Sequence, residues 1–247
     1  MPLFCAWPDG AAATRLGQTG PVDDGHAAGR YAADRYAAIV LAGGDGRRLG
    51  GRDKPALPVG GRPMLLRVLD AVAEAVPRVV VGPDRPDLPV DVIGVRENPP
   101  GGGPVAALAA GLAAVVTRTD RTDSADRIDR TDRADSADRT DCGLVAVLAA
   151  DLPFLGVPDV EALRAAVGDQ DGAVLVDADG RQQWLCGVYR VAALRGRLAD
   201  LGPPAGQSVR RLVSGFRLVT VARRGAGAPP WYDCDTDEDY RQAQELA

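Results

Sequence analysis

The residues best suited to chemistry gather around the single lysine of the chain. Lys54 follows a glycine-rich segment, 43–51, which itself follows the apolar run 39–41. Glycines can bring backbone N–H groups against a phosphate because they carry no Cβ, and Arg47, Arg48 and Lys54 add positive charge. Of the 29 basic residues only Lys54 is a lysine, whose compact ammonium differs chemically from a planar guanidinium. The pattern predicts a nucleoside triphosphate site.

Two common glycine loops do not fit this segment. A P-loop needs Lys followed by Ser or Thr after its last glycine, whereas segment 46–51 is followed by Arg52 and Asp53. A dinucleotide-binding fingerprint needs G-x-G-x-x-G and an acidic residue about 20 positions later. Here Gly50 comes one position late, and Asp70 falls within an expected helix. The segment therefore belongs to a different class of phosphate site.

Carboxylates downstream supply the second half of the predicted site. Asp151 directly follows the most hydrophobic segment, 143–150, where it could bind a metal ion over the phosphate loop. The alternative is an N-cap for the next helix, which fits less well because we expect that helix to begin near Pro158. Asp233 and Asp235 are two further carboxylates, which lie just before a predicted capping box.

The expected elements position these residues at one edge of a sheet. Apolar strands alternate with helices whose apolar residues recur at three- and four-residue steps, which implies a parallel sheet covered on both faces. The expected fold class is α/β, a three-layer α/β/α arrangement with a Rossmann-like, mostly parallel sheet. The expected strands are 39–41, 78–82, 92–95, 143–150, 172–177, 184–190 and 217–221; the expected helices are 63–76, 104–116, one from about 158, 191–201, 208–213 and one capped by Thr236 with Asp239.

Ligands of such open sheets bind at the carboxyl ends of the strands. A second glycine-rich segment, 97–104, also follows an expected strand, so we expect it at the same edge as Lys54. An ordinary turn before a helix is the alternative interpretation.

Two segments depart from this pattern. Residues 1–35 have no sustained periodicity and contain the only histidine, His26, so we expect a disordered N-terminal extension. Residues 118–141 repeat aspartate at every third position with arginines between, which predicts a solvated, low-complexity insertion. Calcium binding by this repeat is disfavoured because the glycine-bearing loops of such repeats are absent. The rest of 36–247 has the size of one α/β domain.

Composition excludes several classes of function. A net charge of −5 disfavours a nucleic-acid partner, and 46% apolar residues suffice for a sizeable core. The four cysteines form no C-x-x-C pair, so neither a zinc site nor a disulfide framework is indicated. No signal peptide or long apolar run stands out, and we expect a soluble, cytoplasmic protein without a membrane partner.

The lysine segment resembles the MobA-like NTP transferases and, among them, the molybdenum cofactor guanylyltransferases. Their hallmark, L-A-G-G-x-x-x-R-[ML]-G followed shortly by a lysine, is matched here by 41–44, 48–50 and Lys54. Asp151 to Pro153 is similar to the family's D-x-P, residues 185–190 to L-x-G-V-Y-R, and 233–239 to its acidic close. Related cytidylyltransferases usually carry L-A-A-G, so Gly43 favours guanine. The resemblance covers about 36–246 apart from the insertion.

This resemblance implies transfer of GMP from GTP to the terminal phosphate of molybdenum-bearing molybdopterin, with Mg²⁺ as cofactor and pyrophosphate as second product. It implies GTP and a molybdopterin-type acceptor as partners, and is compatible with an interaction with molybdoenzyme maturation proteins. The implied catalytic residues are Lys54, Arg48 and Asp151; the implied metal ligands are Asp151, Asp233 and Asp235; the implied nucleotide contacts are Leu41, Ala42, Gly43, Gly44, Lys54, Gly82, Glu97, Gly103 and Asp151.

Two residues depart from the family, because Gly82 stands where a polar residue is often found and Glu97 replaces the commoner aspartate. The alternatives are a CTP-dependent cytidylyltransferase, a guanylyltransferase for another phosphorylated acceptor such as phospholactate, and a non-catalytic nucleotide-binding protein that delivers the cofactor. A pure binding protein would not need Lys54, Asp151 and the Asp233/Asp235 pair together, so their joint presence favours an enzyme.

Overall fold

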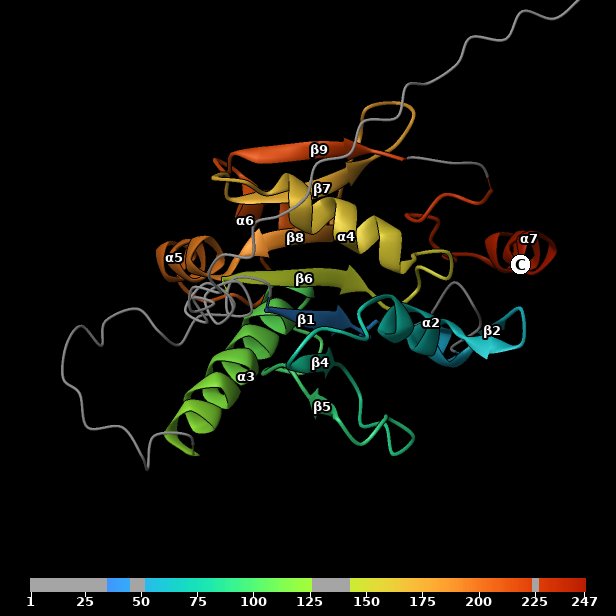
Figure 1. The fold of residues 1–247 in the computed structure, drawn as a ribbon. Coiled ribbons are helices and arrows are strands. Elements are labelled where there is room, and N and C mark those ends of the chain that lie inside the picture. Colours follow the sequence, from blue (N-terminus) through green and yellow to red (C-terminus); the bar gives the residue numbers. More distant parts are fainter. Residues whose placement is uncertain (1–34, 45–51, 126–142, 224–226) are drawn as a thin grey trace, which may run out of the picture. The chain divides into compact units, whose positions relative to one another are not determined.

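A mixed β-sheet runs through the centre of the structure, a computed structural model that describes residues 35–44, 52–125, 143–223 and 227–247 (Figure 1). Within these residues the sheet has seven strands in the order β5-β4-β1-β6-β8-β7-β9, and β8 alone is antiparallel to its neighbours. The strands are β1 (Tyr36–Leu41), β4 (Arg78–Val81), β5 (Val92–Val95), β6 (Leu144–Ala149), β7 (Gly172–Val176), β8 (Gln182–Arg190) and β9 (Leu218–Ala222).

Helices cover both faces of this sheet and bury a separate apolar cluster on each. On one face α2 (Met64–Ala71) and α4 (Val157–Ala166) pack on the sheet; on the other lie α3 (Pro104–Ala125), α5 (Val191–Leu201) and α6 (Val209–Val213). Side chains alternate along β1, since Ala38 and Val40 belong to the first cluster and Ile39 and Leu41 to the second. The predicted three-layer α/β/α fold with a mostly parallel sheet is confirmed.

Two helix ends differ from the expected ones. Helix α2 ends at Ala71 rather than near 76. The residues after it turn back toward β4, and the N–H of Val76 donates to the carbonyl of Tyr36 in β1. Helix α3 continues to Ala125, past residue 118 where we expected the insertion to begin. Once nucleated, a helix adds one hydrogen bond per residue and can therefore extend beyond its apolar stretch. The expected insertion from 126 onward and the extension over 1–34 lie outside the described residues.

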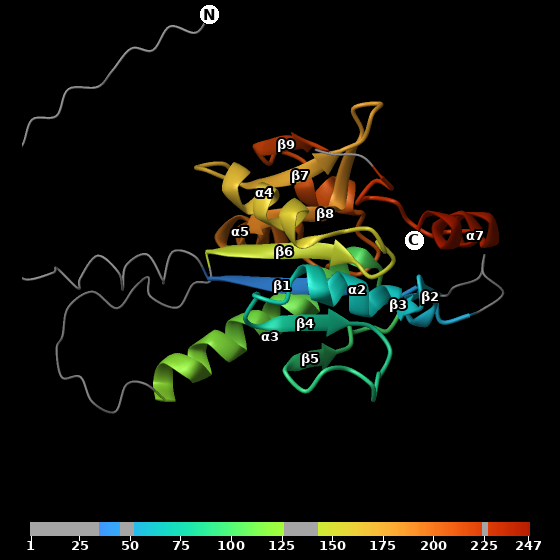
Figure 2. The same ribbon diagram turned by 45° about the vertical axis from the view of Figure 1, so that its right-hand side comes forward.

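A small outlying unit lies beyond the carboxyl ends of β1 and β6 (Figure 2). It contains the hairpin of β2 (Pro58–Val59) and β3 (Arg62–Pro63) and the C-terminal helix α7 (Asp237–Leu246). The hairpin turns on Gly60 and Gly61, whose φ angles of 56° and 78° favour glycine. The carboxyl edge of the sheet therefore faces the hairpin and α7. No helix in the described residues is long and apolar enough to cross a membrane.

Candidate active site

Lys54 and two carboxylates meet beyond the carboxyl edge of the sheet. The ammonium of Lys54 forms ion pairs with Asp151 and with Asp235, the latter at 2.6 Å from Nζ to Oδ1. The side chains of Lys54 and Asp151 are only 15% and 19% exposed, whereas Asp235 is half exposed. Residues almost a hundred positions apart in sequence thus share one ion-pair network, and Lys54 and Asp151 lie at the same sheet edge, as the sequence predicted.

Parallel strands explain how these groups come together. Lys54 opens the short 3₁₀ helix η2 (Lys54–Ala56), which follows the segment leaving β1, and Asp151 lies just past the end of β6, the strand paired with β1. Asp151 does not cap α4, because Gly156 is the N-cap residue and its N–H donates to the carboxylate of Asp159. The N-cap interpretation of Asp151 is therefore wrong, and its carboxylate faces Lys54 instead.

A third carboxylate, Asp233, completes the charged cluster. It lies beside Cys234, which is fully buried in a small apolar cluster, and close enough to Asp151, Asp235 and Lys54 to interact with their charges. Burial, followed by repulsion from Asp235 and Asp151, raises the pKa of Asp233 above its ordinary value, although Lys54 opposes the shift. Negative charge at this edge therefore exceeds what one ammonium neutralises.

The pKa of the Lys54 ammonium is raised despite partial burial. Burial alone would lower this pKa, but attraction by Asp151 and hydrogen bonds with Asp151 and Asp235 outweigh it. Lys54 consequently remains a cation at neutral pH, which suits it to binding phosphate oxygens rather than to accepting a proton.

No group of three or more His, Cys, Asp or Glu side chains is arranged to hold a metal ion in the described residues. The ammonium of Lys54 lies between Asp151 and Asp235, so these carboxylates neutralise the lysine. A magnesium ion in nucleotide enzymes commonly uses one or two carboxylates together with substrate phosphates and water. The arrangement is compatible with such a site but does not form one from protein ligands alone.

The first glycine segment combines a buried start with an exposed end. Leu41 and Ala42 are buried, and the N–H of Ala42 donates to the carbonyl of Val81 at 2.7 Å. Gly43 and Gly44 are exposed. Backbone donation to a ligand is therefore expected from Gly43 onward, not from Ala42. Arg48 lies outside the described residues.

Glu97 and Gly82 approach the same segment from neighbouring strands. A methyl group on Gly43 would lie 3.9 Å from Oε1 of Glu97, which also accepts a hydrogen bond of 2.9 Å from the N–H of Gly101. Oε2 of Glu97 is buried and has no hydrogen-bond partner among the described residues. A Cβ at Gly82 would lie 2.8 Å from the carbonyl of Ala42, so the backbone itself needs glycine there. Gly103, with φ +88°, directly precedes α3.

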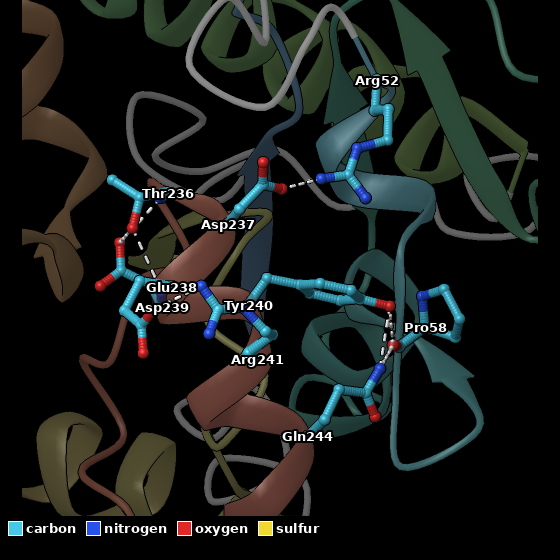
Figure 3. A network of polar contacts seen from close by, with 9 residues as sticks. All are labelled: Arg52, Pro58, Thr236, Asp237, Glu238, Asp239, Tyr240, Arg241 and Gln244. Carbon is cyan, nitrogen blue, oxygen red and sulfur yellow. Dashed lines mark hydrogen bonds and ion pairs between the residues drawn. The ribbon is translucent and has the colours of Figure 1, made fainter.

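Helix α7 contacts the segments on both sides of Lys54 through an ion pair and hydrogen bonds (Figure 3). Asp237 forms an ion pair with Arg52, while Tyr240 donates a 2.8 Å hydrogen bond to the carbonyl of Pro58, which also accepts from Gln244. The predicted capping box of Thr236 and Asp239 is confirmed, with bonds of 3.1 Å and 2.7 Å. These contacts hold Asp235, which directly precedes the cap, next to Lys54.

Sequence reasoning missed one residue at this edge. Arg85, in the loop after β4, forms two 2.6 Å hydrogen bonds with the carboxylate of Asp53, the residue before Lys54. Its segment, G-P-D-R-P-D-L-P, has the composition of an ordinary turn, and nothing local in it indicates a partner 32 positions away. Only the sheet order, which places β4 beside β1, could have suggested the contact.

Comparisons with known proteins decide the family. The family model of the MobA-like NTP transferase domain matches residues 38–221, which include Lys54 and Asp151. The chain belongs to this family. A molybdenum cofactor guanylyltransferase from Rhodobacter capsulatus is 36% identical over 217 residues, 85% of this chain and 96% of the relative. Another from Mesorhizobium japonicum is 27% identical, also over 217 residues, 85% of this chain and 95% of the relative.

Solved structures support the fold of this MobA-like NTP transferase. The molybdopterin-guanine dinucleotide biosynthesis protein A of Archaeoglobus fulgidus matches with a TM-score of 0.57 at 17% identity, covering 85% of this chain and 97% of the other. A 2-C-methyl-D-erythritol 4-phosphate cytidylyltransferase from Thermus thermophilus matches with a TM-score of 0.56 at 18% identity, covering 86% and 98%. The predicted family and the prediction of a nucleotidyltransferase enzyme are confirmed by the family and its named relatives.

Proposed function

We propose that this enzyme transfers GMP from GTP to the terminal phosphate of a molybdenum-bearing molybdopterin and releases pyrophosphate. The observation that carries the proposal is the convergence of Lys54, Asp151 and Asp235 at the carboxyl edge of β1 and β6. The relatives named molybdenum cofactor guanylyltransferase support guanine and a molybdopterin acceptor. A purely binding protein would not need both the partly buried ammonium and the surrounding carboxylates.

The reaction needs no general base. A phosphate nucleophile has a second pKa of about 6 and is largely deprotonated at neutral pH. Its oxygen attacks the α-phosphorus of GTP, the bond to the β-phosphate oxygen breaks, and pyrophosphate leaves with the electron pair. The protein must therefore supply position and charge rather than proton transfer. This agrees with a chain whose only histidine, His26, lies in its N-terminal region.

Lys54 would bind the triphosphate. In the free enzyme its ammonium is held by Asp151 and Asp235 at a partly buried position. A bound triphosphate offers oxygens of higher charge, and the ammonium can contact one of them without leaving Asp151. Such a donor, fixed before the reaction begins, stabilises the charge that develops on the leaving pyrophosphate.

Asp151, with Asp233 or Asp235, would hold Mg²⁺. The donor set fits this ion because Mg²⁺ prefers carboxylate oxygens and keeps places for phosphate and water. Burial and then repulsion from Asp235 and Asp151 raise the pKa of Asp233, and a bound cation would relieve that repulsion. When bound, Mg²⁺ would neutralise phosphate charge and orient the α-phosphorus for in-line attack.

Gly43, Gly44 and Glu97 would face the nucleotide. The exposed backbone at Gly43 can approach a ligand closely, and Oε2 of Glu97 is a buried acceptor beside it without a partner among the described residues. A buried carboxylate oxygen that lacks a donor is costly, and an N–H of the base or a ribose hydroxyl would satisfy it.

Pyrophosphate release with each of the four nucleoside triphosphates tests this function. The enzyme, Mg²⁺ and molybdenum-bearing molybdopterin are incubated with GTP, CTP, ATP or UTP. We expect release to be fastest with GTP and to require the acceptor. A preference for CTP would assign a cytidylyltransferase instead, and no release with any nucleotide would favour a binding protein.

A further inference from the structure

Arg85 makes a two-pronged contact with the residue that precedes Lys54. Its two terminal nitrogens lie 2.6 Å from the two carboxylate oxygens of Asp53, and one of them also lies 3.5 Å from the carbonyl oxygen of Ala42. The Arg85 side chain is only 12% exposed. One guanidinium thus joins the loop after β4, the end of β1 and the turn that carries Lys54.

This contact replaces the usual local role of Asp53. Asp53 is the N-cap residue of η2, a position where aspartate normally accepts a hydrogen bond from the following backbone N–H groups. Here the Asp53 side chain makes no capping hydrogen bond. Its carboxylate is turned toward Arg85, so a residue 32 positions away fixes the orientation of the backbone immediately before Lys54.

Stability alone explains the pair poorly. Nε of Arg85 is buried without a hydrogen-bond partner among the described residues, and an unsatisfied buried donor is unfavourable. The Asp53 side chain is half exposed, and an ion pair in contact with solvent contributes little to stability. The pair is better explained as a link that fixes the loop after β4 to the turn carrying Lys54, at the edge where Lys54 meets Asp151.

We propose that Arg85 is a positioning residue for Lys54, acting through Asp53. By holding the turn 52–56 against the loop after β4, Arg85 keeps the Lys54 ammonium beside Asp151 in the orientation that receives the triphosphate. This inference rests on the proposed role of Lys54 in nucleotidyl transfer and extends it to residues outside the glycine segment and the metal carboxylates.

The kinetic test compares Arg85→Ala, Arg85→Lys and Asp53→Ala with Arg62→Ala. The Arg62–Asp70 pair serves as the control, since it is also bidentate, through Nε and Nη2 at 2.6 and 2.7 Å, but lies on the surface of β3 and α2. We expect kcat to fall by about 10- to 100-fold in the Arg85 and Asp53 variants, because small misplacements of catalytic groups have effects of this size. Arg62→Ala should retain full turnover.

Double variants show whether Arg85 acts through its partners. Arg85→Ala should add little to the loss in Asp53→Ala, and little to the loss in Lys54→Ala, because residues of one unit are not additive. Independent, multiplicative losses in both backgrounds would overturn the proposal. So would equal turnover in Arg85→Ala and Arg62→Ala.

The single lysine allows a second readout that needs no turnover. Protein grown with ¹⁵N-labelled lysine contains one labelled side-chain ammonium, that of Lys54. Its NMR signal should shift or broaden in Arg85→Ala but stay unchanged in Arg62→Ala. An unchanged signal in Arg85→Ala would overturn the proposal. If the wild type transfers no nucleotide, the proposed function fails while this spectrum still decides whether Arg85 positions Lys54.

Discussion

At the scale of single residues, the site is an ammonium surrounded by an excess of carboxylates. Lys54 and Asp151 could be predicted from sequence because each comes after an apolar strand, Lys54 beyond the glycine-rich segment and Asp151 at once. Neighbouring parallel strands end at the same edge of the sheet, so the two side chains were expected to lie together. Asp235 could be named as a candidate only through the family resemblance, because its approach depends on how α7 folds back. Arg85 carries no local signal of any kind.

Asp233 should weaken the fold at neutral pH. Its pKa is raised in the folded protein, so the folded state disfavours its ionised form, and stability is lost as pH rises from about the ordinary value of 3.8 through the folded pKa. We expect Asp233→Asn to raise the melting temperature at pH 7 in metal-free buffer, with a gain that shrinks toward pH 4. Thermal melts of both proteins across this range measure it, and a gain independent of pH would contradict the electrostatic cause.

At the scale of elements, α7 holds the segment that carries Lys54 in place. Its contacts with Arg52 and Pro58 lie on either side of Lys54, and its cap residue Thr236 directly follows Asp235 (Figure 3). The sequence predicted the helix and its capping box because both are local patterns. The docking of α7 on the hairpin of β2 and β3 joins residues more than 180 positions apart and left no comparable pattern.

Removing the α7 cap should therefore affect both stability and turnover. Thr236→Ala deletes the hydroxyl that accepts from the N–H of Asp239, and we expect a loss of about 0.5–2 kcal/mol in urea unfolding. Turnover should fall as well, because Asp235 loses its anchored neighbour. Thr236→Ser keeps the hydroxyl and should behave like the wild type. Full turnover in a destabilised Thr236→Ala variant would contradict the view that α7 keeps Asp235 in place for the reaction.

At the scale of the whole molecule, an apolar cluster on each face of the sheet packs the helices against the strands. The alternation of apolar segments was sufficient to predict the layers and the parallel strands of this fold. Strand order and the reversed β8 could not be read the same way, because both depend on pairings between distant strands rather than on periodicity. The ends of α2 and α3 differ from the expected ones, because a turn ends α2 early and α3 continues past its apolar stretch.

Two helix glycines should respond oppositely to alanine. A methyl group on Gly111 of α3 would lie 2.6 Å from Cγ2 of Ile39, so Gly111→Ala should cost about 1–3 kcal/mol through overpacking against β1. Gly196 of α5 is exposed, and a methyl group there would meet no other part of the fold within 4 Å, so Gly196→Ala should gain about 0.5–1 kcal/mol. Urea unfolding of both variants measures this. Equal effects would contradict the close packing of α3 on the sheet.

Mass spectrometric detection of the dinucleotide product tests the central claim most directly. Wild-type enzyme, Lys54→Ala and Asp151→Asn are each incubated with GTP, Mg²⁺ and molybdenum-bearing molybdopterin. The wild type should form the guanine dinucleotide, and each variant should form it about 100- to 1,000-fold more slowly while keeping its fold by circular dichroism. Near-normal product formation by either folded variant would contradict the assignment of this ion pair to nucleotidyl transfer.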